Sequence, residues 1–424
     1  MQPSSNAQAS PEHASANYRH LVGDVFWFGV AFPSTARFLS IYAIRLDASA
    51  ALLGWISALP AIILLITSAL APWWRKRYGS TVGALFWPGL GFRLVFLLPA
   101  LTPVFPHAFQ PYWLLLAVAL PALAQGVSSV LFLVVLREGV DARDLPGLMS
   151  RRSFAFNVAV GLATVGFGFW LSEVTFPFNY QAMFVAAFAV SLISLWHVQA
   201  LREINPSTMP QRVKGAMRAL LRTPVFQRVA STSTLVHLSF FSILPIIPLW
   251  LVNRFDADEQ FLSYFGLVEI AAAALIATQT GRIVRRLGTR ATIAAGLAIT
   301  GVAAGLLAAA PSLPVTLVAA AISGAAWTAT SISVFTYFSE NTPPENVTHF
   351  STAYNQVVSL AIFVGPLLGS QLAGLLPDLS VVLLIGAVLR LAAAALIPLD
   401  LFGRDRRTPL PEPQPEIDQV SVSG

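Results

Sequence analysis

Residues 72–81 read PWWRKRYGST, and residues 281–290, which lie 209 positions later, read GRIVRRLGTR. Each stretch is a short basic connection between two long apolar runs. The same shift of 209 positions places RLDAS (45–49) on RFDAD (254–258). The agreement lies in polar loop positions, where a chance likeness between two apolar helices would not produce it. It therefore predicts a chain made of two repeated halves, an arrangement typical of membrane transporters.

Apolar runs flank these connections and recur through the whole chain. Of the 424 residues, 56% are hydrophobic and only 11% are charged, and the mean hydropathy is +0.69. Because a soluble domain carries about 25% charged residues, a soluble enzyme is nearly excluded. A helix needs about 20 residues to cross a hydrocarbon layer of about 30 Å, so the sequence predicts an all-α polytopic membrane protein with twelve transmembrane helices in two six-helix bundles. The predicted spans are 21–45, 50–73, 81–103, 112–136, 154–172, 180–200, 227–252, 259–280, 291–310, 313–338, 350–374 and 379–402.

The basic residues gather on one side of the predicted membrane. Of the 26 Lys and Arg residues, Arg37, Arg93 and Arg390 lie within spans, and Arg45 and Arg254 fall in loops of the opposite side. All the others fall on the side of the chain ends. Because cytoplasmic loops are enriched in Lys and Arg, both termini are expected in the cytoplasm, with the protein in a plasma (inner) membrane. The net charge of +6 is then an orientation signal, and no nucleic-acid partner is expected.

The longest connection, which is also basic, lies between the sixth and seventh spans. This cytoplasmic linker (201–226) separates an N-terminal six-helix bundle (20–200) from a C-terminal one (227–403). The polar ends of the chain, 1–19 and 404–424, are predicted to be disordered cytoplasmic tails.

Several classes of chemistry are excluded by what the sequence lacks. There is no cysteine, and the six histidines are scattered without ligand spacing, so neither a metal site nor a thiol chemistry is expected. Nothing matches the nucleotide-binding pattern G-x-x-x-x-G-K-[ST]. We therefore predict no cofactor, no metal and no enzymatic activity. Two alternatives on the same scaffold are an intramembrane enzyme, which would need clustered acids or histidines, and a non-transporting sensor, which would need an output domain.

The second connection resembles the loop signature of the major facilitator superfamily (MFS), Gly-x-x-x-Asp-Arg-x-Gly-x-Arg. WRKRYG (74–79) is a degenerate copy in the first half. The matching residues are Arg77 and Gly79 in the first copy and Gly281, Arg286, Gly288 and Arg290 in the second. Lys76 and Arg285 replace the signature aspartate, so the charge latch that this acid forms in the family is altered or absent here. The glycines keep a physical role in tight turns between helix and loop.

The resemblance covers the whole chain and implies a function. It implies a secondary active transporter of a small solute that works by alternating access, with spans 1, 4, 7 and 10 around a central cavity. The expected partners are a small-molecule substrate, for which an anion is one candidate, a proton or another coupling ion, and the lipid bilayer, and we expect a monomer. GPLLGS (365–370) looks like a glycine-proline motif of antiporters in this family, but it lies in span 11 instead of span 5. Packing glycines are the favoured interpretation.

Ionisable residues inside a membrane helix cost at least about 2.5–3.5 kcal/mol each, so the few present here are functional candidates. Glu269, in the eighth span, is the acid that lies deepest, and a buried carboxyl suits proton uptake and release. Arg37 is predicted at a similar depth, which makes a contact between the halves possible. Glu269 either carries the coupling proton or forms a static ion pair with a buried arginine. Arg37 either binds an anionic group of the substrate or only pairs with Glu269 as a gate.

Two further ionisable residues could have a functional role or a purely structural one. His237, in the seventh span, contacts substrate, relays protons or is a packing histidine held by a hydrogen bond. Asp24 is a coupling candidate or a solvated acid at the cytoplasmic end of the first span. Arg93 and Arg390 lie in peripheral spans, where structural pairing or snorkelling is expected.

Uncharged polar residues gather on the spans expected to line the cavity. They either contact the substrate or form hydrogen bonds between helices. Trp327 would provide an apolar wall. The candidates are Gln125, Ser128, Asn157, Trp327, Thr328, Ser331, Asn355 and Gln356.

Overall fold

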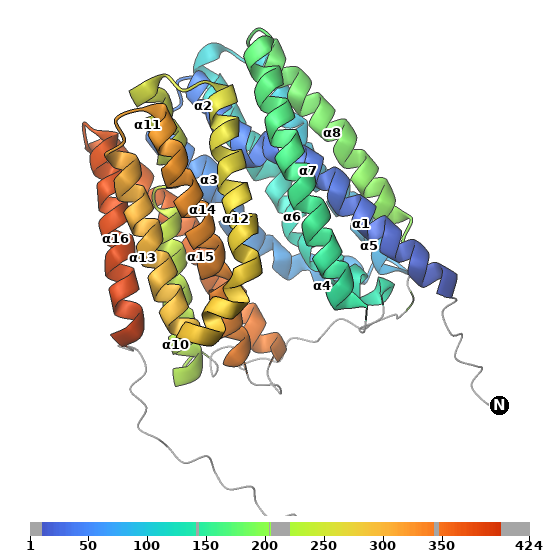
Figure 1. Ribbon diagram of the computed structural model, residues 1–424. Coiled ribbons are helices and arrows are strands. Elements are labelled where there is room, and N and C mark those ends of the chain that lie inside the picture. Colours follow the sequence, from blue (N-terminus) through green and yellow to red (C-terminus); the bar gives the residue numbers. More distant parts are fainter. Residues whose placement is uncertain (1–10, 141–143, 203, 205–220, 343–346, 400–424) are drawn as a thin grey trace, which may run out of the picture.

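The chain folds into long helices that run roughly side by side in two groups (Figure 1). Within the part that the structure describes, ten helices are long and apolar enough to cross a membrane, and a bent pair, Thr81–Phe96 and Leu98–Val104, adds an eleventh span. The predicted all-helical polytopic fold is thereby confirmed. This computed structural model describes residues 11–140, 144–202, 204, 221–342 and 347–399.

The helices of the N-terminal half follow the first six predicted spans. They are α1 (Pro11–Pro33), the π-helical segment η1 (Ser34–Phe38) and α2 (Leu39–Arg45); α3 (Ala50–Thr67), η2 (Ser68–Leu70) and α4 (Ala71–Arg75); α5 (Thr81–Arg93), η3 (Leu94–Phe96) and η4 (Leu98–Val104); η5 (His107–Phe109) and α6 (Gln110–Gly139); α7 (Leu145–Glu173); and α8 (Phe178–Gln199).

The helices of the C-terminal half follow the remaining six. They are α10 (Pro224–Phe241) and α11 (Ile246–Phe255); α12 (Glu259–Leu287); α13 (Thr289–Ala308); α14 (Leu313–Glu340); α15 (Val347–Leu375); and α16 (Leu379–Leu399).

The first helix begins earlier than the sequence predicts. α1 starts at Pro11, so residues 11–19, predicted to belong to a disordered tail, form its first turns. They are held in place because Asn17 Nδ2 donates to the carbonyl oxygens of Gly139 (2.8 Å) and Arg202 (2.7 Å), and its Oδ1 accepts from the Arg202 backbone N–H (3.0 Å). A polar segment without an apolar stripe is ordered here by side-chain hydrogen bonds to helix ends.

By apolarity, the described residues supply at most eleven of the twelve predicted spans. The first predicted span is not among them, since Arg19, His20 and Asp24 lower the mean hydropathy of α1. The tail predicted at 404–424 and most of the linker 201–226 lie outside the described residues.

The two halves repeat the same helix packing. In the N-terminal half α1 packs on α7 and α8, and in the C-terminal half α10 packs on α15 and α16. The pairs α3–α6, α5–α6 and α5–α8 likewise correspond to α12–α14, α13–α14 and α13–α16. The halves meet mainly where α3 packs on α15 and α7 packs on α12. The repeat read from the loop sequences is therefore a repeat of architecture.

Both halves begin with a span that breaks at a proline. Pro33 ends α1 and leads into the π-helical segment Ser34–Phe38, and Pro245 separates α10 from α11. Proline lacks the backbone N–H, and its ring clashes with the carbonyl four residues earlier, so regular hydrogen bonding stops there. A proline does not always end a helix here, since Pro60, Pro121 and Pro366 lie inside continuous α-helices.

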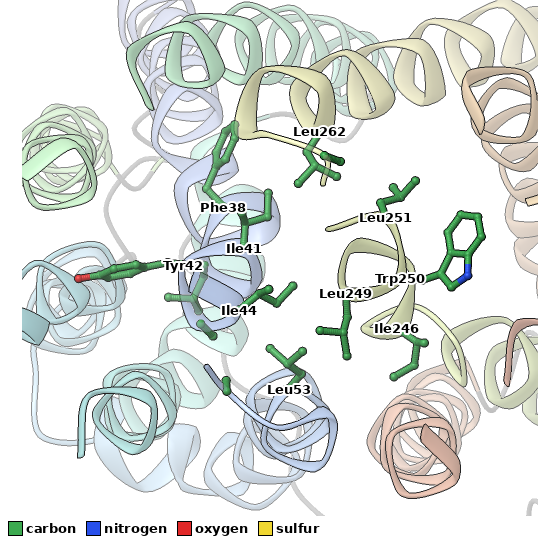
Figure 2. Packing of buried hydrophobic residues seen from close by; sticks show 14 of the residues in the cluster. Phe38, Ile41, Tyr42, Ile44, Leu53, Ile246, Leu249, Trp250, Leu251 and Leu262 are labelled. Carbon is green, nitrogen blue, oxygen red and sulfur yellow. The ribbon is translucent and has the colours of Figure 1, made fainter. Parts of the chain in front are cut away.

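The apolar core that joins the halves lies opposite the end of the molecule at which α1 begins and α16 ends, which we call the terminus end. There, buried residues of α2 and α3, such as Ile44 and Leu53, belong to one cluster with Leu249 and Leu251 of α11 and Leu262 of α12 (Figure 2). At the other end each half has a core of its own, one from residues 21–201 and one from residues 226–397. Among the described residues, the apolar core that both halves share therefore lies at one end of the molecule.

Candidate functional site: ion pairs between the halves and a cavity in the N-terminal half

Arg37 and Glu269 form an ion pair between the two halves. Arg37 Nη2 donates to Glu269 Oε2 over 2.9 Å, and each side chain is 27% exposed. Arg37 comes from the π-helical segment after Pro33, and Glu269 comes from the middle of α12. The structure thus brings together the two residues that the sequence placed at similar depth.

Two glycines make room for this pair. A Cβ atom on Gly266, one turn before Glu269, would lie 2.4 Å from Cζ of Arg37. A Cβ atom on Gly324 of α14 would lie 2.2 Å from the Glu269 carbonyl oxygen. Because these distances are far below van der Waals contact, only glycine allows the guanidinium to lie on α12 and α14 to pack behind it.

A second ion pair joins the halves near the end opposite the termini. Arg45 Nε and Nη2 donate to Glu259 Oε1 and Oε2 over 2.9 and 3.0 Å, in the bidentate geometry that is strongest for this pair. The Tyr180 hydroxyl also donates to Glu259 Oε1 over 3.0 Å. Glu259 is buried although it lies in the first turn of α12. Glu259 was not among the residues predicted from the sequence, where its only signal is its place one position after the RFDAD stretch (254–258).

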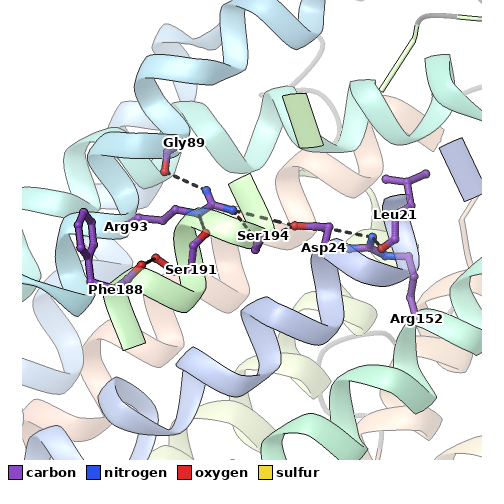
Figure 3. A network of polar contacts seen from close by, with 8 residues as sticks. All are labelled: Leu21, Asp24, Gly89, Arg93, Arg152, Phe188, Ser191 and Ser194. Carbon is purple, nitrogen blue, oxygen red and sulfur yellow. Dashed lines mark hydrogen bonds and ion pairs between the residues drawn. The ribbon is translucent and has the colours of Figure 1, made fainter. Parts of the chain in front are cut away.

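Asp24 is the centre of a buried polar cluster in the N-terminal half (Figure 3). Its Oδ2 accepts from Arg152 Nη1 (3.2 Å), its Oδ1 accepts from the Ser194 hydroxyl (2.7 Å), and Arg93 Nη2 lies 4.0 Å from Oδ1. Only 5% of Asp24 is exposed. The interpretation as a solvated interface acid is therefore wrong, because α7 and α8 cover this side of α1. Arg152, placed in a loop by the sequence, lies in α7.

Hydrogen bonds from Arg93 link α5 to α8, and those from Arg390 link α16 to α10 and α13. Arg93 of α5 donates to the Gly89 and Ser191 carbonyl oxygens and to the Ser194 hydroxyl, over 2.9, 2.6 and 2.7 Å. Arg390 of α16 donates to backbone carbonyls of α10 and α13, and its guanidinium lies 4.6 Å from the centre of the Phe240 ring. Their partners are mostly backbone carbonyls, which suits a structural role.

His237 belongs to an aromatic group in the C-terminal half. Its Nδ1 lies 2.8 Å from the Ser233 carbonyl oxygen, and its ring packs on Phe241 and edge-on to Trp327. Trp327 of α14 in turn stacks on Phe240 with ring centres 3.7 Å apart. The hydrogen bond to the preceding turn favours the packing interpretation of His237.

A cavity of ≈ 590 Å³ lies wholly within the N-terminal half, between α1, α5, α6, α7 and α8. Asp24, Arg93 and Arg152 line it, together with the predicted cavity residues Gln125 and Ser128. The other six predicted residues do not line it. Asn157 donates to the Ser153 carbonyl oxygen, Ser331 donates to that of Thr328, and Trp327, Thr328, Ser331, Asn355 and Gln356 belong to α14 and α15.

The loop-signature residues have unequal roles. Gly288 has a φ of +82° at the junction of α12 and α13, a conformation that glycine adopts without strain. Arg290 donates to the Ile397 carbonyl oxygen of α16, and the Arg77 guanidinium stacks over Trp73 at 3.3 Å. Gly79 lies in the bend between α4 and α5, without a positive φ, whereas Gly281 lies within α12 and does not fill the predicted turn role. Arg286 ends up in the last turn of α12.

GPLLGS (365–370) lies in α15, where its glycines face α10. A Cβ atom on Gly369 would lie 1.7 Å from the Ser242 carbonyl oxygen, and one on Gly365 would lie 3.1 Å from that of Leu238. These contacts agree with the favoured interpretation as packing glycines.

Comparisons with known proteins agree with this architecture. The family model of the Major Facilitator Superfamily matches residues 23–366 and 229–422. No curated protein matches. Three similar solved structures are a nucleoside transporter, an auto-inhibited peptide transporter and a bacterial homologue of the iron transporter ferroportin in an inward-facing state. Each is 12% identical to this chain and covers 91% of it. In the same order, the TM-scores are 0.72, 0.70 and 0.69, and the matches cover 99%, 96% and 98% of the other chain.

At such low identity these structures show the fold alone, and the family follows from the family model over most of the chain. The chain therefore belongs to the Major Facilitator Superfamily and is a multi-pass membrane protein and a secondary transporter, not an enzyme.

Proposed function

We propose that this transporter moves a small solute by alternating access, with a proton as the coupling ion and Glu269 as the residue that carries it. The observation that supports this most is the 2.9 Å pair between Glu269 and Arg37, which belong to different halves. Both side chains remain partly exposed, so a proton can reach the carboxylate. Protonation removes the charge that holds Arg37 and thereby loosens a contact between the halves.

Arg37 is suited to a second part in the same step. Only its Nη2 has an acceptor among the described residues, so Nε and Nη1 are free to donate. When Glu269 is protonated, the whole guanidinium is available to an anionic group of the substrate. Proton binding and substrate binding are then linked through one arginine, which is the coupling that a secondary transporter needs.

The orientation of the basic residues supports placing both termini in the cytoplasm, in a plasma (inner) membrane. The halves are joined by a shared core and by Arg45 and Glu259 at the end opposite the termini. In that orientation the structure is the inward-facing state. Breaking the Arg45–Glu259 contact accompanies the change to the outward-facing state.

The coupling role can be tested by following the distance between the halves. The chain contains no cysteine, so Ser150→Cys in α7 and Ser339→Cys in α14 would be the only spin-labelled positions. In lipid nanodiscs, double electron–electron resonance should measure the distance between the labels at positions 150 and 339. This distance, at the terminus end, should become shorter as the pH falls. Glu269→Gln, which mimics the protonated acid, should show the low-pH distribution at every pH.

Glu173→Gln, an exposed acid at the end of α7, serves as the matched control and should keep the wild-type response. An unchanged pH response in Glu269→Gln would contradict the coupling role of this residue. Flux of an identified substrate into proteoliposomes under an imposed pH gradient would then test the coupling ion directly.

A further inference from the structure

We propose that the cavity in the N-terminal half binds an amphipathic organic anion, an aromatic or aliphatic body that carries one carboxylate or similar acidic group. This inference goes beyond the proposed function, because it assigns an anion site within the N-terminal half that is separate from Arg37. It rests on the cavity itself and uses neither Arg37 nor Glu269.

The polar end of the cavity has an excess of positive charge. One carboxylate, that of Asp24, faces the two guanidinium groups of Arg152 and Arg93, at 3.2 and 4.0 Å. No second carboxylate lies within 4.0 Å of either guanidinium among the residues that the structure describes. The cluster therefore carries a net charge of +1 in a largely buried place. A buried charge without a counter-ion is costly, so an anion that completes the cluster is favoured there.

The two arginines differ in how many of their guanidinium nitrogens already donate hydrogen bonds to the protein. Arg93 uses Nε, Nη1 and Nη2 on Ser191, Gly89 and Ser194. Arg152 uses only Nη1, on Asp24 and on the Leu21 carbonyl oxygen. Its Nε and Nη2 have no hydrogen-bond acceptor in the described part of the chain. These two nitrogens lie on one edge of the guanidinium, which is the edge that binds a carboxylate through two parallel hydrogen bonds.

The rest of the wall is aromatic. Phe28, Phe32 and Phe156 pack on one another with ring centres 5.3–6.5 Å apart, and Phe92 and Phe96 extend this surface beside Phe28. Such a surface binds the apolar part of a ligand. It offers no partner to a second charged group on that ligand. The volume of ≈ 590 Å³ falls in the range of about 300–1,000 Å³ that is usual for small-molecule sites.

Gln125 and Ser128 of α6 add a small number of uncharged polar groups to this wall. The Gln125 side chain has no hydrogen-bond partner among the described residues, so its amide is available to a ligand. A mostly apolar pocket with one cationic end therefore selects for amphipathic monoanions over neutral and cationic compounds.

A series of ligands with one ring system tests the charge preference. We would measure binding of 2-naphthylacetate, its neutral amide and 2-(2-naphthyl)ethylamine by calorimetry, with the full-length protein in phosphatidylcholine nanodiscs and empty nanodiscs as the blank. The carboxylate should bind about tenfold or more tightly than the amide, and the amine most weakly. Equal binding of the carboxylate and the amide would overturn the proposal.

Variants locate the site. Arg152→Gln should weaken carboxylate binding about tenfold and leave amide binding unchanged, and Arg152→Lys should be intermediate because it keeps the charge but loses the paired donors. Ser128→Phe, which fills the cavity from α6, should abolish binding of all three compounds. Arg151→Gln, an exposed neighbour that does not line the cavity, is the matched control. Wild-type affinity for the carboxylate in both Arg152→Gln and Ser128→Phe would contradict the proposal.

A membrane lipid could supply the same anionic, amphipathic chemistry as a free solute. Adding phosphatidylglycerol to the nanodiscs should leave naphthylacetate binding unchanged if the site takes free anions, and should compete with it if the site takes lipid. Because calorimetry does not depend on Glu269, loss of anion binding together with an intact pH-dependent distance change would overturn this inference alone. The opposite result would overturn the coupling proposal alone.

Discussion

A Cβ atom on Gly266 of α12 would lie 2.4 Å from Cζ of Arg37, which belongs to the other half of the molecule. The guanidinium therefore reaches Glu269 across a position that has no side chain. A side chain at position 266 would push the Arg37 guanidinium away from Glu269. The ion pair is therefore sensitive to the addition of a single methyl group at this position.

We expect Gly266→Ala to separate Arg37 from Glu269 while leaving the fold intact. The atoms that must move are the end of a flexible side chain, so the free energy of unfolding should change by no more than about 1 kcal/mol. The pH-dependent distance between labelled positions 150 and 339 should lose most of its range. Gly305→Ala in α13, where an added Cβ meets nothing within 4 Å, should behave as the parent protein. A full pH response in Gly266→Ala would show that the pair is not part of the coupling.

Glu259→Gln should favour opening at the end opposite the termini. The change removes the charge that binds Arg45 through two hydrogen bonds and also accepts from Tyr180. Hydrogen bonds to charged groups contribute about 1.5–3 kcal/mol each, and the partial exposure of Arg45 puts this pair at the lower end. Spin labels on the two halves near this end should report a larger fraction of long distances. Tyr180→Phe should give a smaller change in the same direction, and a shift toward shorter distances in either variant would refute this assignment.

Gly369→Ala should destabilise the C-terminal half. Its added Cβ would lie 1.7 Å from the Ser242 carbonyl oxygen, and a backbone atom cannot turn aside as a side chain can. Overpacking of this kind costs about 1–3 kcal/mol or more, so the thermal unfolding midpoint should fall clearly. Gly374→Ala, later in the same helix and with nothing within 4 Å of the added Cβ, is the matched control. Equal midpoints for the two variants would mean that α15 moves away from α10 at little cost.

Arg390→Met should destabilise the fold strongly, although methionine and arginine side chains are similar in size. Arg390 is 1% exposed and donates to the carbonyl oxygens of Ser239, Phe240 and Thr300. Losing three hydrogen bonds from a charged donor should cost at least about 3 kcal/mol. Fluorescence-detected size exclusion after heating would measure the loss. Arg254→Met, at an exposed position, should cost little, and Arg390→Lys should lie between the two.

Much of the fold could be predicted because a membrane imposes a simple rule on sequence. Every backbone polar group must be satisfied inside the hydrocarbon layer, so each long apolar run becomes a helix. The helices begin and end close to the predicted limits at such positions as Ala50, Glu259 and Leu379. The start of α1 was missed because Asn17 is fixed by hydrogen bonds to residues far along the chain, which no local pattern reveals.

The candidate site was predictable only in part, for a related reason. The positions of Arg37 and Glu269 along their spans give their depth, and depth was enough to predict that a contact was possible. The partners of Asp24 and Arg45 depend on how helices are rotated and which neighbours they meet. Hydropathy carries little of this information, because a helix face turned to lipid and one turned to protein are both apolar.

The sequence alone therefore determined the class, the repeat, most of the spans and the few ionisable residues inside them, since these follow from counting apolar and basic residues along the chain. Only the tertiary structure decided that Arg37 reaches Glu269 over Gly266, and that Arg152 and Asp24 face a cavity within one half. The physical reason is that apolarity is a property of each segment by itself, whereas charge pairing and cavity shape arise between segments that the chain brings together from more than a hundred residues apart.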